Sequence, residues 1–142
     1  MIVICLKKCG DGFKEKVIQK WTRSDFSHVG IIFSDGQEGS SWSECGVSFK
    51  DHKIKRCYKY FLIKNVDEKK VKKFFIDRLD AKYNNESIVL SHLLNLGLGA
   101  KKKYTCSEIV YLALLDAGVI NTMINPQDIT PGILHELLNH NK

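Results

Sequence analysis

The chain has 142 residues, of which 44% are apolar and 27% are charged. This length suits one domain with a sizeable core and excludes two full domains, so we expect a single domain over residues 1–142. No stretch approaches the roughly 18 apolar residues of a membrane span. Residues 1–6 are too short for the apolar region of a signal peptide, so we expect a cytoplasmic protein, in the host cytoplasm if a phage encodes it.

The net charge is +6, from 22 basic and 16 acidic residues. Nearly all of the basic residues are lysine, whereas base-edge and bidentate phosphate recognition favour arginine. The lysine clusters at 69–73 and 101–103 are short, and no segment matches a nucleic-acid-binding motif. A basic surface that attracts an anionic partner stays open as a second interpretation.

Five cysteines are an odd number, so they cannot all pair in disulfides. In a chain without a signal peptide we expect reduced thiols. Only Cys5 and Cys9 lie close together in the sequence. The sequence has no second cysteine pair or HxxxH motif that could supply the other two ligands of a zinc site. The sequence therefore predicts no metal site and no cofactor.

Short apolar runs alternate with turn signals in the first half of the chain. Apolar, β-branched runs predict strands, and apolar residues at positions 13, 17 and 21 predict an amphipathic helix. The turn signal at 34–36 joins two of the strands as a hairpin. The predicted elements are strands at 2–6, 27–33, 40–49 and 58–63 and a helix at 13–21.

Helical patterns dominate the second half. Asp67 or Asn65 can cap a helix that buries Val71, Phe74, Phe75 and Leu79. An apolar stretch follows at 88–98, then a buried helix at 106–115 that Gly118 ends, and a last helix that Thr130 and Pro131 begin. Strands followed by helices predict an α+β fold.

Two residues stand out by their surroundings. Cys106 opens an apolar helix, where unpaired N–H groups and the helix dipole favour a thiolate and can stabilise an oxyanion. His28 begins an apolar strand, from which it can serve as a general base and then as an acid. Each also has a plainer interpretation, since cysteines pack in cores as small apolar residues and most strand histidines are structural.

A third residue should hold the imidazole in one tautomer. Glu44 is the candidate, because a strand at 40–49 paired with the His28 strand would bring it alongside the ring, although an exposed glutamate is often only solvated. Tyr104, Ser107 and Ser27 flank the two candidates and are expected to line the substrate site, with support of the helix start as the alternative for Ser107 and core packing as the alternative for Tyr104. Glu108 is expected to act as a carboxylate that the helix dipole favours rather than as a catalytic group.

Two sequence blocks together resemble a known family. Residues 26–32 (FSHVGII) and 104–108 (YTCSE) resemble the circularly permuted papain-like hydrolases of the NlpC superfamily, in particular the YiiX/YaeF-like branch with its phage and poxvirus members. In that family the Ser-His-Val strand comes first and the Cys-Ser-Glu helix comes late. Residues 42–47, 80–84 and 125–131 resemble the family's second strand, the stretch before its cysteine helix and its closing segment.

The resemblance implies a small antiparallel sheet packed against helices that include the nucleophile helix. It implies Cys106 as nucleophile, His28 as general base and Glu44 as the orienting residue of a peptidase, amidase or acyl hydrolase. The expected function is thus cleavage or transfer at an amide, ester or thioester bond of a peptide, amide or acyl substrate. The alternative is a non-catalytic basic module that binds an anionic partner such as nucleic acid or a phospholipid surface.

Overall fold

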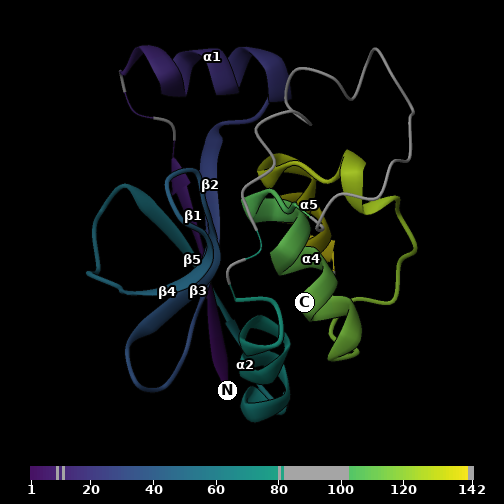
Figure 1. The fold of residues 1–142 in the computed structure, drawn as a ribbon. Coiled ribbons are helices and arrows are strands. Elements are labelled where there is room, and N and C mark those ends of the chain that lie inside the picture. The colour runs from purple at the N-terminus through teal and green to yellow at the C-terminus, as the bar shows by residue number, and fades with distance from the viewer. Residues whose placement is uncertain (9, 11, 80, 82–102, 141–142) are drawn as a thin grey trace.

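The computed structural model of the protein describes residues 1–8, 10, 12–79, 81 and 103–140. These residues form an α+β fold, as the sequence predicts (Figure 1). In chain order the elements are β1 (Ile2–Lys8), α1 (Phe13–Thr22), β2 (Phe26–Ile32), β3 (Gln37–Trp42), β4 (Gly46–Asp51), β5 (Tyr58–Ile63), α2 (Glu68–Ile76), α4 (Cys106–Asp116), the 3-10 turn η1 (Pro126–Asp128) and α5 (Pro131–His140).

The five strands form one antiparallel sheet in the order β4-β3-β2-β1-β5. β1 lies between β2 and β5, and β2 turns into β3 through the predicted turn at 34–36. The ladder between β2 and β3 comprises the pairs Ile31–Gly39 and Ile32–Glu38, whereas the ladder between β3 and β4 runs over six pairs. The backbone pairing of β2 with β3 is thus limited to the end near their shared turn.

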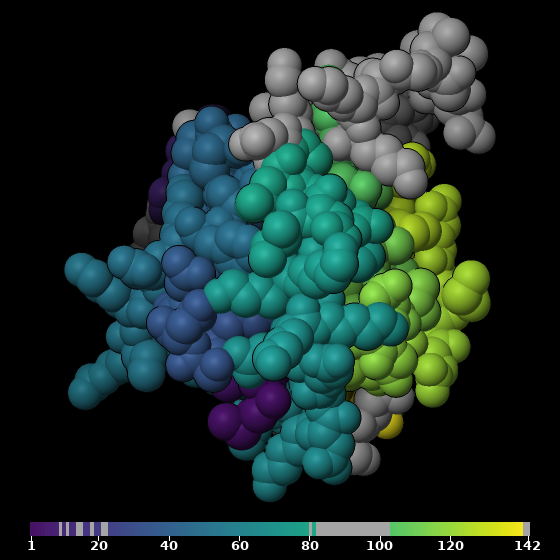
Figure 2. All heavy atoms as spheres, turned by 60° about the horizontal axis from the view of Figure 1, so that its bottom comes forward, coloured from purple at the N-terminus to yellow at the C-terminus, as the bar shows by residue number. Residues whose placement is uncertain are grey.

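Alternating side chains give the sheet two different faces. Ile4, Leu6, Val29 and Ile31 are fully buried on the face that carries the main core. The helices α4 and α5 lie on this side of the sheet (Figure 1). The teal residues of α2 fill the space between the blue strands and the green residues of α4 (Figure 2), in agreement with the contacts of α2 with β3, β4 and α4.

The predicted strand at 40–49 is two strands. Trp42 pairs with Gly46, and Ser43, Glu44 and Cys45 form the turn between β3 and β4. Gly46 has a φ of 72°, a left-handed conformation that glycine adopts without steric cost. A three-residue loop followed by such a glycine is a common hairpin connection. The turn residues, rather than the alternating apolar pattern, therefore determine the structure of residues 40–49.

The helix boundaries follow the capping signals. The side chain of Asp67 accepts hydrogen bonds from the N–H groups of Lys69 and Lys70 at the start of α2. Phe74 and Phe75 are both buried, so ordinary packing accounts for this adjacent pair. Gly118, with a φ of 71°, follows the end of α4 as predicted.

One predicted helix differs from expectation in its burial, and two predicted segments cannot be compared. The helix α1 forms, but Phe13 and Val17 on its apolar side are 84% and 39% exposed. The predicted apolar stretch at 88–98 and most of the family-like segment at 80–84 lie outside the described residues. Among the helices that the structure describes, none combines the length and apolar character needed to cross a bilayer.

Candidate functional site

Cys106 is the first residue of α4 and is 5% exposed. The helix begins there because Thr105 and Glu108 form a capping box, in which each side chain accepts a hydrogen bond from the other residue's backbone N–H. Glu108 is therefore a capping residue, in line with the sequence interpretation. The capping box does not engage the N–H groups of Cys106 and Ser107, which lie at the positive end of the helix dipole.

Two buried serine hydroxyls form hydrogen bonds where β2 and β3 separate from each other. The hydroxyl of Ser40 donates to the carbonyl of Val29 at 2.7 Å, between β3 and β2. The hydroxyl of Ser41 donates to the carbonyl of Tyr104 at 2.8 Å, just before α4. The start of α4 is thereby fixed against β3, and the helix also packs on β2, the strand that carries His28.

His28 occupies an irregular part of β2. Its pairing partner is Lys7, and the register of the β1–β2 ladder shifts between Lys7 and Lys8, as in a β-bulge. The Nε2 atom of His28 lies 3.0 Å from Oε1 of Glu38, and the ring of Trp42 stacks on the imidazole with 4.4 Å between centroids. Because Nε2 faces Glu38, Nδ1 is the ring nitrogen left for Cys106.

Cys106 and His28 contact each other, and each favours the charged form of the other. Burial by itself raises the pKa of Cys106, but the hydrogen bond and charge of His28, followed by the N–H groups of Val29 and Ser107, outweigh burial and lower it. Burial likewise disfavours a charged His28, but its contacts with Cys106 and then Glu38 raise its pKa to about 9. The predicted approach of these two residues is therefore found, and it favours the charged pair.

Glu38 is the carboxylate beside His28 and is only 3% exposed. Its Oε1 faces His28, and its Oε2 lies 2.6 Å from Nδ1 of His52. Burial opposes ionisation of Glu38, but these two histidines outweigh it and lower its pKa. The side chain fits because residue 30 is glycine, since a Cβ on Gly30 would overlap the carboxylate of Glu38.

The expected contact between Glu44 and His28 is wrong. The Glu44 side chain is 63% exposed and binds Lys50 and Ser43 instead. The hydrogen bond from Lys50 lowers the pKa of Glu44 to about 2, with smaller contributions from the backbone N–H of Glu44 itself and from the hydroxyl of Ser43. This is expected for a surface ion pair rather than a carboxylate of the site. The physical reason is the turn at 43–45, which removes Glu44 from the strand that the sequence pattern predicts.

The pairing register of β2 and β3 is the sequence signal that could have indicated Glu38. A hairpin closed by the turn at 34–36 pairs Ile32 with Glu38, and residues 28, 30 and 32 share one face of β2. Glu38 therefore projects from the same face as His28, and Gly30 between them leaves room for its side chain. His52 has no comparable signal, because its approach to Glu38 depends on the pairing of β3 with β4.

The three expected substrate-site residues have different surroundings. The hydroxyl of Ser107 donates to the carbonyl of Ile129 at 2.6 Å, and Tyr104 is buried in the core, so both hold the helix start in place. The hydroxyl of Ser27 and the Nε1 atom of Trp42 are buried without a hydrogen-bond partner among the described residues. Ser27 and Trp42 thus each keep an unused hydrogen-bond donor, and Trp42 does so beside His28.

A set of possible metal ligands lies behind Glu38. Cys5 Sγ, a carboxylate oxygen of Glu38 and a ring nitrogen of His52 all lie within 4.8 Å of one another. Thiolate, imidazole and carboxylate together suit Zn²⁺. The same groups are also hydrogen-bonded within the protein, since Glu38 binds two histidines and Cys5 contacts the carbonyl of Gly30. Each of these three groups thus already has a hydrogen-bond partner within the protein.

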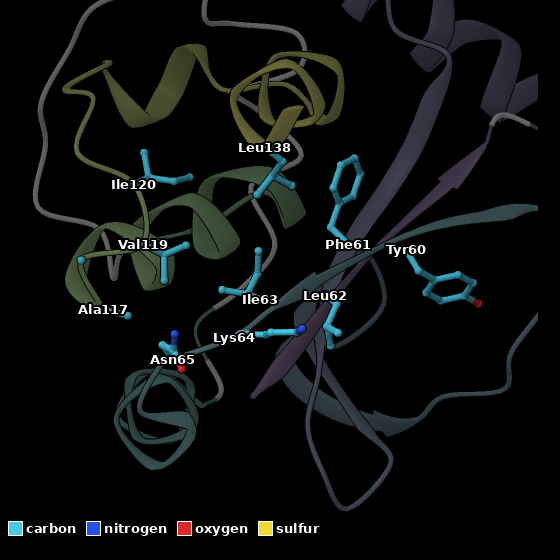
Figure 3. Close-up of a pocket in the computed structure, with 11 residues that line it drawn as sticks. Tyr60, Phe61, Leu62, Ile63, Lys64, Asn65, Ala117, Val119, Ile120 and Leu138 are labelled. Carbon is cyan, nitrogen blue, oxygen red and sulfur yellow. The ribbon is translucent and has the colours of Figure 1, made fainter. Parts of the chain in front are cut away.

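A groove along β5 is separate from this cluster (Figure 3). The residues that line it come from β5 and the loop after it, from the loop after α4 and from α5, and neither Cys106, His28 nor Glu38 is among them. Tyr60 belongs to the groove through its position on β5, while its ring points away from the labelled apolar side chains (Figure 3). That ring instead reaches His52, with 3.1 Å between the hydroxyl and Nε2.

Comparison with known proteins adds no family to this geometry. The chain matches no family model, and no curated protein matches it.

Proposed function

We propose that this protein is a cysteine hydrolase or acyltransferase in which Cys106, His28 and Glu38 act in sequence. The observation that carries the proposal is the position of His28, which contacts Glu38 through Nε2 and pairs with the thiol of Cys106. A nucleophile, a base and a residue that orients the base form the arrangement expected for covalent catalysis. Glu38 takes the role that the sequence assigns to Glu44.

In the first half of the reaction the Cys106 thiolate attacks the carbonyl carbon of the substrate. A C–S bond forms, and the electrons of the C=O double bond move to oxygen. The N–H groups at the start of α4, and the indole N–H of Trp42, are the nearby donors for that oxyanion. As the oxyanion collapses, the bond to the leaving group breaks and His28 gives its proton to the departing amine, alcohol or thiol.

In the second half His28 is neutral and serves as the base. It takes a proton from water, or from an acceptor nucleophile in a transfer reaction, as that group attacks the acyl–Cys106 thioester. The C–S bond breaks and the thiolate–imidazolium pair returns. This chemistry requires no metal or organic cofactor, and its substrate class is a peptide, amide or acyl compound.

The proposal extends to fold and location. The resemblance to permuted papain-like hydrolases of the NlpC superfamily agrees with a histidine strand, β2, that precedes the cysteine helix, α4. We therefore propose a permuted papain-like arrangement within the observed α+β fold. We also propose a cytoplasmic location, a compartment in which thiols such as those of Cys5, Cys45, Cys57 and Cys106 stay reduced.

Acyl-enzyme trapping tests the proposal without a known substrate. The chain is treated with a series of activated esters and thioesters, and the acylated cysteine is identified by mass spectrometry. We expect acylation of Cys106 that disappears in His28→Ala, while the exposed Cys45 and Cys57 serve as internal references for ordinary thiols. Acylation of Cys45 or Cys57 as readily as Cys106, or no effect of His28→Ala, would contradict the proposal.

A further inference from the structure

We infer that His52 is a second positioning residue, which acts on His28 through Glu38 and is itself oriented by Tyr60. The inference rests on the proposed function, because it concerns how the Cys106–His28 pair is kept in its charged form. Its starting point is the geometry of Glu38, whose two carboxylate oxygens each face a different histidine.

The two histidines hold Glu38 from opposite ends. Oε1 is 3.0 Å from Nε2 of His28 and Oε2 is 2.6 Å from Nδ1 of His52. The side chains of Glu38 and His52 are only 3% and 4% exposed, so water does not readily replace a lost donor. Cys5 Sγ also lies within 4.8 Å of a Glu38 oxygen, but His52 makes the shorter contact at 2.6 Å. Without it the carboxylate would lose the contact that best fixes its plane, and Oε1 would lose its fixed position beside His28.

Tyr60 determines which nitrogen of His52 carries the proton. The N–H of Lys55 donates to the Tyr60 hydroxyl oxygen at 3.2 Å, so the hydroxyl oxygen serves there as an acceptor. The single hydroxyl hydrogen has two acceptors within reach, the carbonyl of Lys55 at 3.5 Å and Nε2 of His52 at 3.1 Å, and the shorter contact favours Nε2 of His52. An Nε2 that accepts this bond leaves the proton of neutral His52 on Nδ1, which is the nitrogen that faces Glu38.

The network connects residues from both outer strands of the sheet to the reacting pair. Tyr60 is on β5, His52 directly follows β4, Glu38 is on β3 and His28 is on β2. The rings of Tyr58 and Tyr60 contact His52 edge-on, with centroids 5.2 and 5.8 Å away, and limit its movement. A side chain held by packing and by hydrogen bonds at both ring nitrogens is suited to fixing another group's orientation.

Two nearly isosteric variants separate positioning from simple packing. His52→Asn keeps an amide N–H close to where Nδ1 lies, so it can still donate to Glu38, whereas His52→Leu has a similar shape without a donor. The readouts are the rate at which iodoacetamide alkylates Cys106 near pH 6, the pH profile of that rate, and the melting temperature. We expect alkylation to slow by about tenfold in His52→Leu and by less than about threefold in His52→Asn.

Tyr60→Phe provides a second and milder test. It removes the donor to Nε2 and keeps the ring, so we expect a smaller slowing and a shift of the alkylation profile to higher pH. If His52→Leu does not fold, the comparison of His52→Asn with His52→Gln, whose amide falls nearer to the Nε2 position, takes its place. In that pair His52→Gln should be the slower.

The possible failures are distinguishable. If Cys106 in the unaltered chain reacts no faster than Cys45 and Cys57, the proposed function fails. If Cys106 is fast and remains equally fast in His52→Leu, or if the melting temperature falls while the pH profile does not move, His52 is only structural and the inference is overturned. If His52→Asn is as slow as His52→Leu, the donor to Glu38 is not what matters, and the inference is also overturned.

Discussion

Replacing Glu38 by glutamine removes the negative charge beside His28 while leaving the size of the side chain unchanged. The contact of 3.0 Å between Nε2 of His28 and Oε1 of Glu38 places the two charge centres about 4 to 5 Å apart. At an effective dielectric constant of about 20, unit charges at that separation attract by about 3 to 4 kcal/mol. This attraction favours the imidazolium form of His28.

Glu38→Gln removes only part of this attraction from the free energy of the Cys106–His28 ion pair. The Cys106 thiolate lies on the other side of the His28 ring and is weakly repelled by Glu38, and the amide oxygen of glutamine keeps a dipolar contact. We therefore expect a net loss of about 1.4 to 3 kcal/mol, which means about 10 to 150 times fewer thiolate–imidazolium pairs at neutral pH. The rate of Cys106 alkylation near pH 6 should fall by the same factor.

Glu44→Gln is the matched control for this experiment. It makes the same chemical change in the exposed turn, where Glu44 binds Lys50 and not His28. We expect Cys106 in Glu44→Gln to react as it does in the unaltered chain. Equal rates in Glu38→Gln and the unaltered chain, or a loss in Glu44→Gln alone, would refute the assignment of Glu38.

Three further predictions follow from the same contacts. Gly30→Ala should slow Cys106 alkylation about as much as Glu38→Gln, because the added Cβ overlaps Glu38; Gly36→Asn, in an open turn, should leave the rate unchanged. Cys106→Ala should abolish acylation while circular dichroism shows a folded chain whose stability changes by about 1 kcal/mol or less, since a small buried side chain is replaced by another. The folded state lowers the pKa of Glu38, so as the pH falls the unfolded chain takes up this proton before the folded chain does. The free energy of unfolding, measured with denaturant, should therefore keep the whole contribution of Glu38 above about pH 4.3 and decline as the pH falls below it. The decline should be less steep in Glu38→Gln.

Local sequence signals account for most of the fold. Asp67, Thr130 and Gly118 mark helix ends through hydrogen bonds and backbone conformations that involve only near neighbours, and the structure places helix ends beside each of them. The strand at 58–63 is likewise found with the predicted bounds. These elements depend little on the rest of the chain, which is why the pattern suffices.

The site is harder to predict because it depends on strand register. Cys106 and His28 are recognisable from the helix start and the apolar strand that carry them, whereas the choice between Glu44 and Glu38 depends on where one hairpin ends. A turn at 43–45 in place of a continuous strand moves Glu44 to the surface. His52 depends on two successive strand pairings, and no local pattern indicates its contact with Glu38.

The most direct test of the central claim is a pH titration of the ultraviolet absorbance of the Cys106 thiolate. The signal is taken as the difference between the unaltered chain and Cys106→Ala, so it does not depend on the access of a reagent, and the titration is repeated in His28→Ala. Our account predicts a Cys106 thiolate that is already present near pH 6 and is lost there in His28→Ala. A thiolate that forms only around the ordinary cysteine pKa of about 8.5, with or without His28, would contradict it.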